Sequence, residues 1–121
     1  MGFSRMEREA VELAAGFYLL LQKYLPPTTT LGELRVLTEV ALGMYRAEPV
    51  CVTQVSERVG LTRWAVGRII QRYIEAGMIR EEKDPADSRR NLLVWTDDAF
   101  RANRDWSQDL LQLWQERGMG S

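Results

Sequence analysis

The sequence predicts a mainly α-helical fold with one small β-hairpin (α+β). Three observations carry this prediction: apolar residues recur at helical spacing along most of the chain, two short stretches in its second half alternate as strands do, and threonine and glycine residues mark the limits of the helical stretches. With 121 residues, 45% of them apolar and 27% charged, the chain has the size and composition of one globular domain spanning residues 1–121.

Composition excludes most enzyme chemistry. The chain has no histidine and one cysteine, so it cannot form a Cys/His zinc site, a Ser-His-Asp triad or an internal disulfide. Its carboxylates are scattered over faces expected to be exposed and form no recognisable catalytic pair. We therefore expect a protein that is not an enzyme and that has neither a metal nor a cofactor.

The longest apolar run near the start, residues 14–21, is far shorter than the roughly 20 residues of a membrane span. Glutamates precede this run where a signal peptide has positive charges, and no small-residue cleavage site follows it. The expectation is a cytoplasmic protein without a membrane partner.

Two helices are predicted in the first part of the chain. Residues 6–25 carry apolar side chains three and four apart over a wide arc, and a Pro-Pro pair ends the pattern. Thr30 and Glu33 form a capping box, in which the threonine oxygen accepts from the Glu33 amide and the glutamate reaches back. A helix follows over about residues 31–44, with an expected buried stripe of Leu34, Leu37, Val40, Ala41 and Met44.

The middle of the chain is predicted to begin with a strand. Residues 49–52 are short, β-branched and bounded by proline, so we expect a brief strand in which Cys51 is an ordinary packed residue. Thr53 then caps a short helix over residues 54–59, which Gly60 closes in a left-handed conformation.

A second, longer helix follows at once. Thr62 caps it, its pattern runs to Ala76, and Gly77 ends it. Because residues 59–62 join the short helix to the longer one through a tight connection, the two form a candidate helix-turn-helix.

The last third predicts a β-hairpin and a final helix. Residues 78–83 and 91–95 read as strands, and the polar loop 84–90 joins them with a long charged tip. Thr96 and the two aspartates after it begin a helix over residues 97–115. The apolar stripe of this helix comprises Phe100, Trp106, Leu110, Leu113 and Trp114.

Positive charge is concentrated in one part of the chain. The net charge is −1, yet residues 62–91 carry seven basic and five acidic side chains. Turning the helix from residue 62 to 76 by about 100° per residue leaves an apolar half and a polar half. The polar half comprises Arg63, Trp64, Gly67, Arg68, Gln71 and Arg72.

These residue types suit DNA. Arginine can bind guanine or phosphate, glutamine can read adenine, and glycine lets a backbone approach closely. A solvated helix face is the alternative, but this face has no acidic residue before Glu75 and exposes a tryptophan. We therefore predict that it contacts DNA.

The hairpin tip extends the same prediction. Arg89 and Arg90 lie there, although Asp84 and Asp87 could neutralise them in a solvated loop. A basic loop beside a basic helix can span the phosphates on both sides of a groove. The complete set of candidate DNA-contacting residues is Thr53, Thr62, Arg63, Trp64, Gly67, Arg68, Gln71, Arg72, Lys83, Arg89 and Arg90.

Three motifs resemble a known family. The stretch LTRWAVGRIIQRYIEAGMI at residues 61–79, DPADSR at 84–89 and WT at 95–96 are similar to the winged helix-turn-helix of the multiple-antibiotic-resistance-regulator (MarR) family. The first and last helices match by position and pattern. One departure is Trp95-Thr-Asp-Asp-Ala99, where the family commonly has Leu-Thr-x-x-Gly.

The resemblance implies a fold and a function. It implies a winged helix-turn-helix with flanking N- and C-terminal dimerisation helices, residues 6–25 and 97–115, around a DNA-binding core, residues 31–96. It further implies a homodimeric transcriptional regulator, usually a repressor, on a pseudo-palindromic operator in double-stranded DNA. The recognition helix 62–76 would enter the major groove and the wing 84–90, through Arg89, the minor groove. Family members often respond to small molecules, and the sequence identifies no effector.

Two other functions stay open from the sequence. Tryptophan is a frequent anchor of protein interfaces, so Trp64 and its neighbouring arginines could hold a protein partner in a winged-helix interaction module. A phage or plasmid replication accessory protein would bind DNA without regulating transcription.

Overall fold

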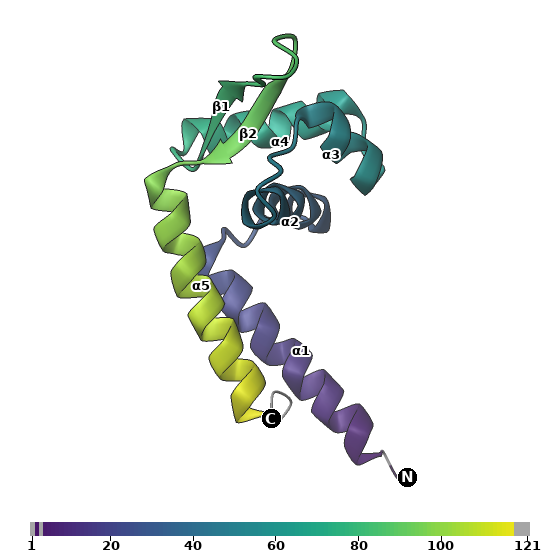
Figure 1. The fold of residues 1–121 in the computed structure, drawn as a ribbon. Coiled ribbons are helices and arrows are strands. Elements are labelled where there is room, and N and C mark those ends of the chain that lie inside the picture. Colours follow the sequence, from purple (N-terminus) through teal and green to yellow (C-terminus); the bar gives the residue numbers. More distant parts are fainter. Residues whose placement is uncertain (1, 3, 118–121) are drawn as a thin grey trace. The chain divides into compact units, whose positions relative to one another are not determined.

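The computed structural model describes residue 2 and residues 4–117. It contains α1 (Arg5–Tyr24), α2 (Leu31–Tyr45), α3 (Val52–Val59), α4 (Arg63–Glu75), β1 (Ile79–Lys83), β2 (Asn91–Trp95) and α5 (Asp97–Glu116), as labelled in Figure 1. The predicted mainly α-helical fold with one hairpin is confirmed. The chain divides into two compact units, residues 29–100 and residues 1–28 with 101–121.

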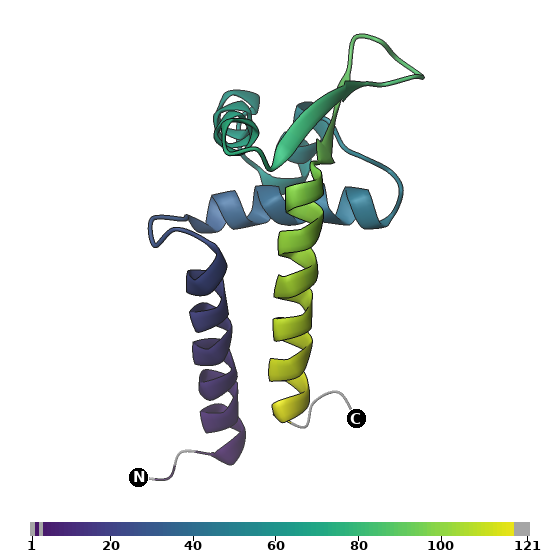
Figure 2. The same cartoon turned by 90° about the vertical axis from the view of Figure 1, so that its left-hand side faces the viewer.

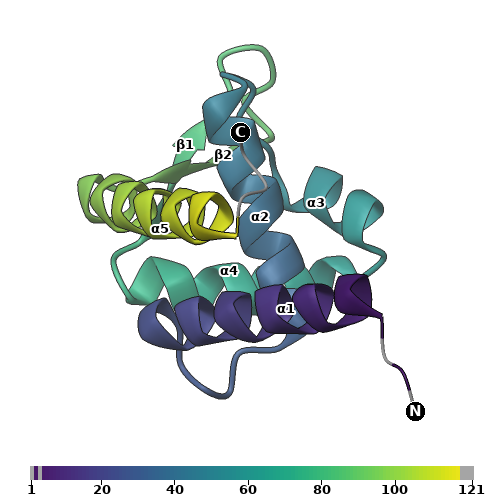
Figure 3. The ribbon, with the colours of Figure 1, turned by 90° about the horizontal axis from the view of Figure 1, so that it is seen from below.

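The unit of residues 29–100 has a core drawn from all its elements. Within it α2 crosses α4, as Figures 1 and 3 show, and α3 packs against both helices. The apolar half of α4 faces inward, so the predicted helix phase is correct. The buried cluster comprises Val36, Val40, Val50, Val55, Val66, Ile69, Ile70, Ile79, Leu93, Trp95 and Ala99.

Helix α2 begins as predicted and buries a partly different stripe. The Thr30 hydroxyl accepts the Glu33 amide at 3.1 Å, which confirms the cap. The Glu33 carboxylate accepts a hydrogen bond from Arg72 at 2.8 Å, a partner that the capping box did not predict. Val36, absent from the predicted stripe, is fully buried with Val40, because the chain after α2 folds back over this side of the helix.

The predicted strand at residues 49–52 is wrong. Residues 49–51 are extended without forming a strand, and their link to the hairpin is a hydrogen bond from the Leu93 amide to the Val50 oxygen at 2.8 Å. Helix α3 already begins at Val52 with Cys51 as its N-cap, so the predicted cap at Thr53 is also wrong. The β-branched side chain of Val50 fills the core instead of a sheet, because tertiary burial overrides strand propensity.

The connection between α3 and α4 follows the sequence. Gly60 closes α3 with a φ of 75°, a left-handed conformation that glycine adopts without strain. The Thr62 hydroxyl accepts the Ala65 amide at 3.1 Å and starts α4. Gly77, with a φ of 76°, follows the end of α4. The helix-turn-helix and the predicted roles of Gly60, Thr62 and Gly77 are therefore confirmed.

The hairpin carries a loop that projects beyond its strands, as Figure 2 shows. β1 and β2 pair antiparallel with Ile79 opposite Trp95 and Lys83 opposite Asn91. Backbone hydrogen bonds order the tip: the Asp84 amide donates to the Arg90 oxygen at 3.0 Å, and the Arg90 amide donates to the Asp87 oxygen at 2.9 Å. These hydrogen bonds give the tip a defined backbone conformation.

The buried Trp95 explains the departure from the family motif. Its ring packs edge-on against Tyr45, with centroids 5.5 Å apart, and against Phe100, at 5.2 Å. Ala99, at the position where the family has glycine, is buried in the same cluster. The larger ring is therefore accommodated by two aromatic neighbours.

The second unit is an antiparallel pair formed by α1 and the part of α5 after residue 100, seen side by side in Figures 1 and 2. Phe17 of α1 packs on Trp106 of α5 with ring centroids 5.7 Å apart. The Asp109 carboxylate accepts from Lys23 and Tyr24, and these hydrogen bonds hold its pKa below the usual 3.8.

This helix pair leaves apolar side chains uncovered. No residue of α1 is buried. Of the stripe predicted on α5, Trp106, Leu110 and Leu113 are partly buried, whereas Phe100 and Trp114 are exposed. The large exposed apolar residues of the pair are Met6, Val11, Tyr18, Leu19, Leu111 and Trp114. Among the described residues, no helix has the length and apolar character that crossing a membrane requires.

Candidate nucleic-acid interface

The polar half of α4 is exposed, as the sequence predicts. Arg63, Arg68 and Gln71 are exposed, and the Trp64 side chain is 71% exposed. At Gly67 no atom lies within 4 Å of the position that a Cβ would occupy, so the helix backbone is open to close approach there. This surface, here called the α4 face, consists of Arg63, Trp64, Gly67, Arg68 and Gln71 and stands on a fully packed core.

Two neighbouring side chains of the α4 face are in contact. The Arg68 guanidinium lies over the Trp64 ring, with its Cζ 4.9 Å from the ring centroid. Residues four apart lie one above the other on a helix, so the contact follows from their spacing. It leaves both side chains available to solvent or a ligand.

Arg72 differs from the other arginines of α4. Its guanidinium donates to Glu33 of α2 at 2.8 Å, and the Glu33 residue is only 8% exposed. This ion pair anchors the C-terminal half of α4 to α2. The sequence placed Arg72 with the other DNA-contacting candidates because its partner lies 39 residues away.

Two other candidates of α4 have local partners. The Thr62 oxygen accepts the amide that starts the helix, so its hydroxyl hydrogen is the group left to donate to a ligand. The Gln71 amide donates weakly to Glu75 at 3.4 Å, a contact that a base edge could replace. Both residues are exposed.

Asp87 holds Arg89 at the hairpin tip. The Arg89 Nε and one terminal nitrogen donate to the two Asp87 oxygens at 3.0 and 3.2 Å, while the Arg89 side chain is 88% exposed. These hydrogen bonds, together with the Arg89 amide, hold the pKa of Asp87 below its usual 3.8. The sequence-based suspicion that Asp87 neutralises this tip is correct for Arg89.

Arg90 turns toward α3. One terminal nitrogen lies 3.5 Å from the sulfur of Cys51, and the Cys51 residue is 6% exposed. Burial raises the pKa of the Cys51 thiol. Hydrogen bonds from the backbone amide of Gln54 and from the Arg90 side chain outweigh burial and leave the pKa below its usual value. Sequence reasoning missed this contact, since Cys51 was assigned to a strand and Arg90 is 39 residues away.

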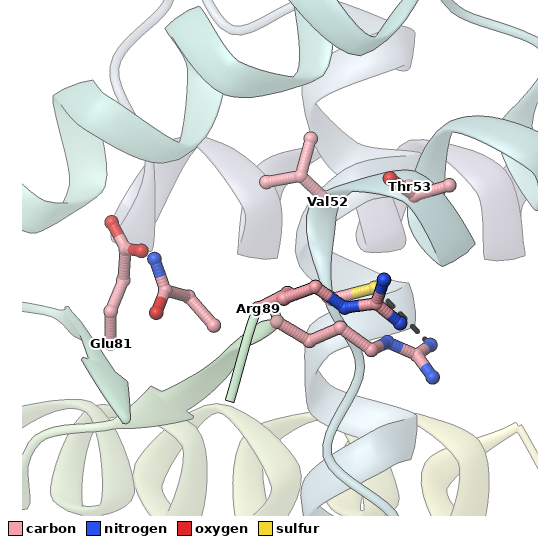
Figure 4. A pocket seen from close by; sticks show the side chains of 7 residues that line it. Val52, Thr53, Glu81 and Arg89 are labelled. Carbon is pink, nitrogen blue, oxygen red and sulfur yellow. Dashed lines mark hydrogen bonds between the residues drawn. The ribbon is translucent and has the colours of Figure 1, made fainter. Parts of the chain in front are cut away.

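The hairpin and the start of α3 enclose a shallow cavity of about 350 Å³. Figure 4 shows Arg89 near Val52 and Thr53, with Glu81 at the other side of the cavity. Its lining residues are Cys51, Val52, Thr53, Glu81, Arg89, Arg90 and Asn91. The structure thus brings Thr53, Arg89 and Arg90 together, while Lys83 is exposed at the end of β1.

The described part of the chain contains no group of three or more His, Cys, Asp or Glu residues arranged to hold a metal ion. The chemistry of the α4 face and the hairpin tip is therefore that of guanidinium, amide, hydroxyl and indole groups, which recognise by hydrogen bonding, charge and stacking.

No family model and no curated protein matches the chain. Solved structures do match it. PcaV, a transcriptional regulator from Streptomyces coelicolor solved with its natural ligand, is 26% identical with a TM-score of 0.57, and the match covers 95% of this chain and 82% of PcaV. A variant of S. aureus MepR bound to an oligodeoxyribonucleotide is 12% identical with a TM-score of 0.74, covering 99% and 86%.

CouR, a transcriptional repressor bound to a 23-mer DNA duplex, is 16% identical with a TM-score of 0.64, and the match covers 95% of this chain and 76% of CouR. PcaV is a transcriptional regulator and CouR a transcriptional repressor. The fold of this chain is thus the winged helix-turn-helix of that class of protein. The chain is similar to these regulators, and the resemblance to the MarR family predicted from its sequence is confirmed.

Proposed function

We propose that the chain is a sequence-specific regulator of transcription that binds double-stranded DNA as a homodimer. The α4 face would enter the major groove, and the wing, residues 84–90, would reach the minor groove. The observation that carries the proposal is the α4 face itself, which stands on a buried core. It has a glutamine, a glycine, an exposed indole and two arginines that form no ion pair with a carboxylate of the described residues. The DNA complexes of MepR and CouR support the same function.

We propose different roles for the candidate residues, on the basis of their positions and partners. Arg63, Arg68 and Gln71 can reach base edges, and Gly67 allows close approach of the helix. Thr53, Thr62, Lys83, Arg89 and Arg90 suit phosphates, because hydroxyl and basic groups at groove margins position a protein on its duplex. Arg72, held by Glu33, anchors α4 rather than reading a base.

Selection of bound duplexes from a random DNA pool tests the proposal. A dimer with two recognition helices reads two half-sites related by symmetry, so we expect a pseudo-palindromic consensus with half-sites about one helical turn apart. A pool that shows no enrichment after repeated rounds would contradict specific DNA binding. We further propose that the chain represses transcription, because CouR is a repressor. We also propose that it responds to a small-molecule effector, because PcaV was solved with its natural ligand. The proposed location is the cytoplasm.

The homodimer is the first testable prediction. The exposed apolar residues of α1 and α5 offer a surface that a second copy can cover, and hydrophobic burial drives such association. Light scattering of the full chain at micromolar concentration should give twice the chain mass of 14.0 kDa. A mass of one chain that does not change with concentration would contradict the dimer and the paired half-sites.

The wing gives the second prediction. Arg89→Ala should weaken DNA binding and lower the dependence of log Kobs on log salt by about 0.9, since each phosphate contact releases counterions to that extent. Fluorescence anisotropy over a salt series measures both quantities. Arg5→Ala, which removes an exposed arginine from α1, is the control and should leave the slope unchanged. An unchanged slope in Arg89→Ala would make the tip a solvated loop.

A protein-interaction module is the second candidate function, and the exposure of Trp64 favours it. The two functions differ in what Trp64→Ala does. A folded variant that binds selected DNA as the wild type does, but has lost a protein partner, would favour the interaction module.

A further inference from the structure

We propose that Trp64 and Arg68 act as one reading unit, in which the indole ring positions the Arg68 guanidinium on a guanine and contacts the methyl group of an adjacent thymine. The unit would specify a thymine–guanine step in each half-site. This inference rests on the proposed function, because it requires the α4 face to lie in a major groove.

The contact between the two side chains sets Arg68 apart from the other arginines near the interface. Arg72 and Arg89 are each paired with a carboxylate, Glu33 and Asp87. In the part of the chain that the structure describes, the recorded contact of Arg68 is the Trp64 ring, 4.9 Å from its Cζ. Arg68 is therefore held in place by an uncharged group and keeps its full positive charge for a ligand.

Positioning matters for this side chain because a free arginine samples many rotamers and loses that freedom when it binds. Guanidinium groups stack on aromatic faces, and their planar fork is then presented edge-on with its donors free. Guanine offers two acceptors, O6 and N7, which match that fork in the major groove. Arg68, with its Cζ 4.9 Å from the Trp64 ring centroid, is thus placed for the base contact that discriminates guanine from the other bases.

The indole ring supplies the second half of the unit. Successive bases along one strand are about 3.4 Å apart, and the Arg68 Cζ lies 4.9 Å from the Trp64 ring centroid, so the two groups together span more than one base step. With Arg68 on a guanine, the ring reaches the neighbouring base pair. The apolar group that a base presents in the major groove is the thymine C5-methyl, which makes it the natural contact of an uncharged ring.

Both side chains are exposed, so the unit can be tested by substitution without loss of the fold. Trp64 is 71% exposed and Arg68 is exposed, and neither belongs to the core cluster. Substitutions at exposed positions outside such clusters usually change stability little. Thermal unfolding of each variant verifies that the fold is retained.

The experiment repeats the random-pool selection with the wild type, Arg68→Ala, Trp64→Ala and Trp64→Phe, and then measures affinities on single-site duplexes. The wild-type consensus should contain the thymine–guanine step. Arg68→Ala should lose its preference for that guanine by about 5- to 150-fold, the range of one bidentate base contact. Trp64→Ala should lose preference at the same guanine as well as at the thymine, and Trp64→Phe, which can still stack, should recover part of the guanine preference.

Replacing the thymine by deoxyuridine isolates the methyl contact, because uracil lacks only that group. The substitution should weaken binding of the wild type and leave binding of Trp64→Ala unchanged. Because the two side chains act as a unit, the loss of affinity in the double variant, Arg68→Ala with Trp64→Ala, should be smaller than the product of the losses in the two single variants.

The outcomes separate this inference from the proposed function. If the wild type selects a palindrome but Trp64→Ala keeps its full guanine preference, or if the two losses simply multiply, the reading unit is overturned while DNA binding stands. If the wild type selects no sequence, the proposed function fails first. Capture of a protein through Trp64 with no effect on DNA selection would also overturn the unit.

Discussion

Leu93→Ala is expected to lower the free energy of unfolding by about 2–5 kcal/mol, the range for truncation of a fully buried leucine. Leu93 is completely buried in the core of residues 29–100, and its amide also joins β2 to Val50. The substitution leaves a cavity between elements that are already packed and cannot readily collapse. Urea unfolding followed by circular dichroism measures the loss.

Leu92→Ala is the matched control for that measurement. Leu92 precedes Leu93 on the same strand but is only partly buried. Its truncation should cost clearly less than that of Leu93. Equal losses of stability at the two positions would contradict the difference in burial between Leu92 and Leu93.

Arg72→Ala is expected to destabilise the fold by about 1–3 kcal/mol, because it leaves the buried Glu33 carboxylate without its charged partner. Arg72 itself is 59% exposed at its side chain, which keeps the loss below that of a fully buried pair. Arg68→Ala, one turn earlier on the same helix, should change stability by less than about 0.5 kcal/mol. Thermal and urea unfolding compare the two variants directly.

The same pair of variants should behave oppositely toward DNA. Arg68→Ala should alter which base is preferred at one position, whereas Arg72→Ala should keep the preference while the protein remains folded. A double replacement, Glu33→Leu with Arg72→Leu, should be closer to the wild type in stability than Arg72→Ala, since removing both charges leaves no unpaired group. A stable Arg72→Ala with altered base preference would assign Arg72 to the groove and not to the fold.

The helix-turn-helix was predictable because its signals are local. Thr30 and Thr62 cap their helices through amides three residues away, and Gly60 and Gly77 adopt the left-handed conformation that ends a helix. The phase of α4 follows from its apolar spacing alone, and so does the exposure of Trp64. These features need only neighbours within one or two turns.

What the sequence did not predict depends on distant partners. Residues 49–52 have strand-like composition, yet the space beside Leu93 and the core is better filled when Val50 is extended and a helix starts at Val52. Glu33 with Arg72, and Cys51 with Arg90, are each separated by 39 residues. No local pattern identifies such pairs, so a sequence shows the charges without showing which of them are already bound.

The contact between Cys51 and Arg90 makes the opening of the hairpin tip measurable by alkylation of the thiol. Cys51 is the single thiol of the sequence, is 6% exposed and lines the cavity between the hairpin and α3, so an alkylating reagent should react with it faster when the hairpin tip opens away from α3. When closing is fast, the observed labelling rate is the chemical rate multiplied by the open population. Alkylation followed by mass spectrometry thus measures the fraction of molecules in which the hairpin tip is open, and a duplex that holds the wing closed should slow the reaction.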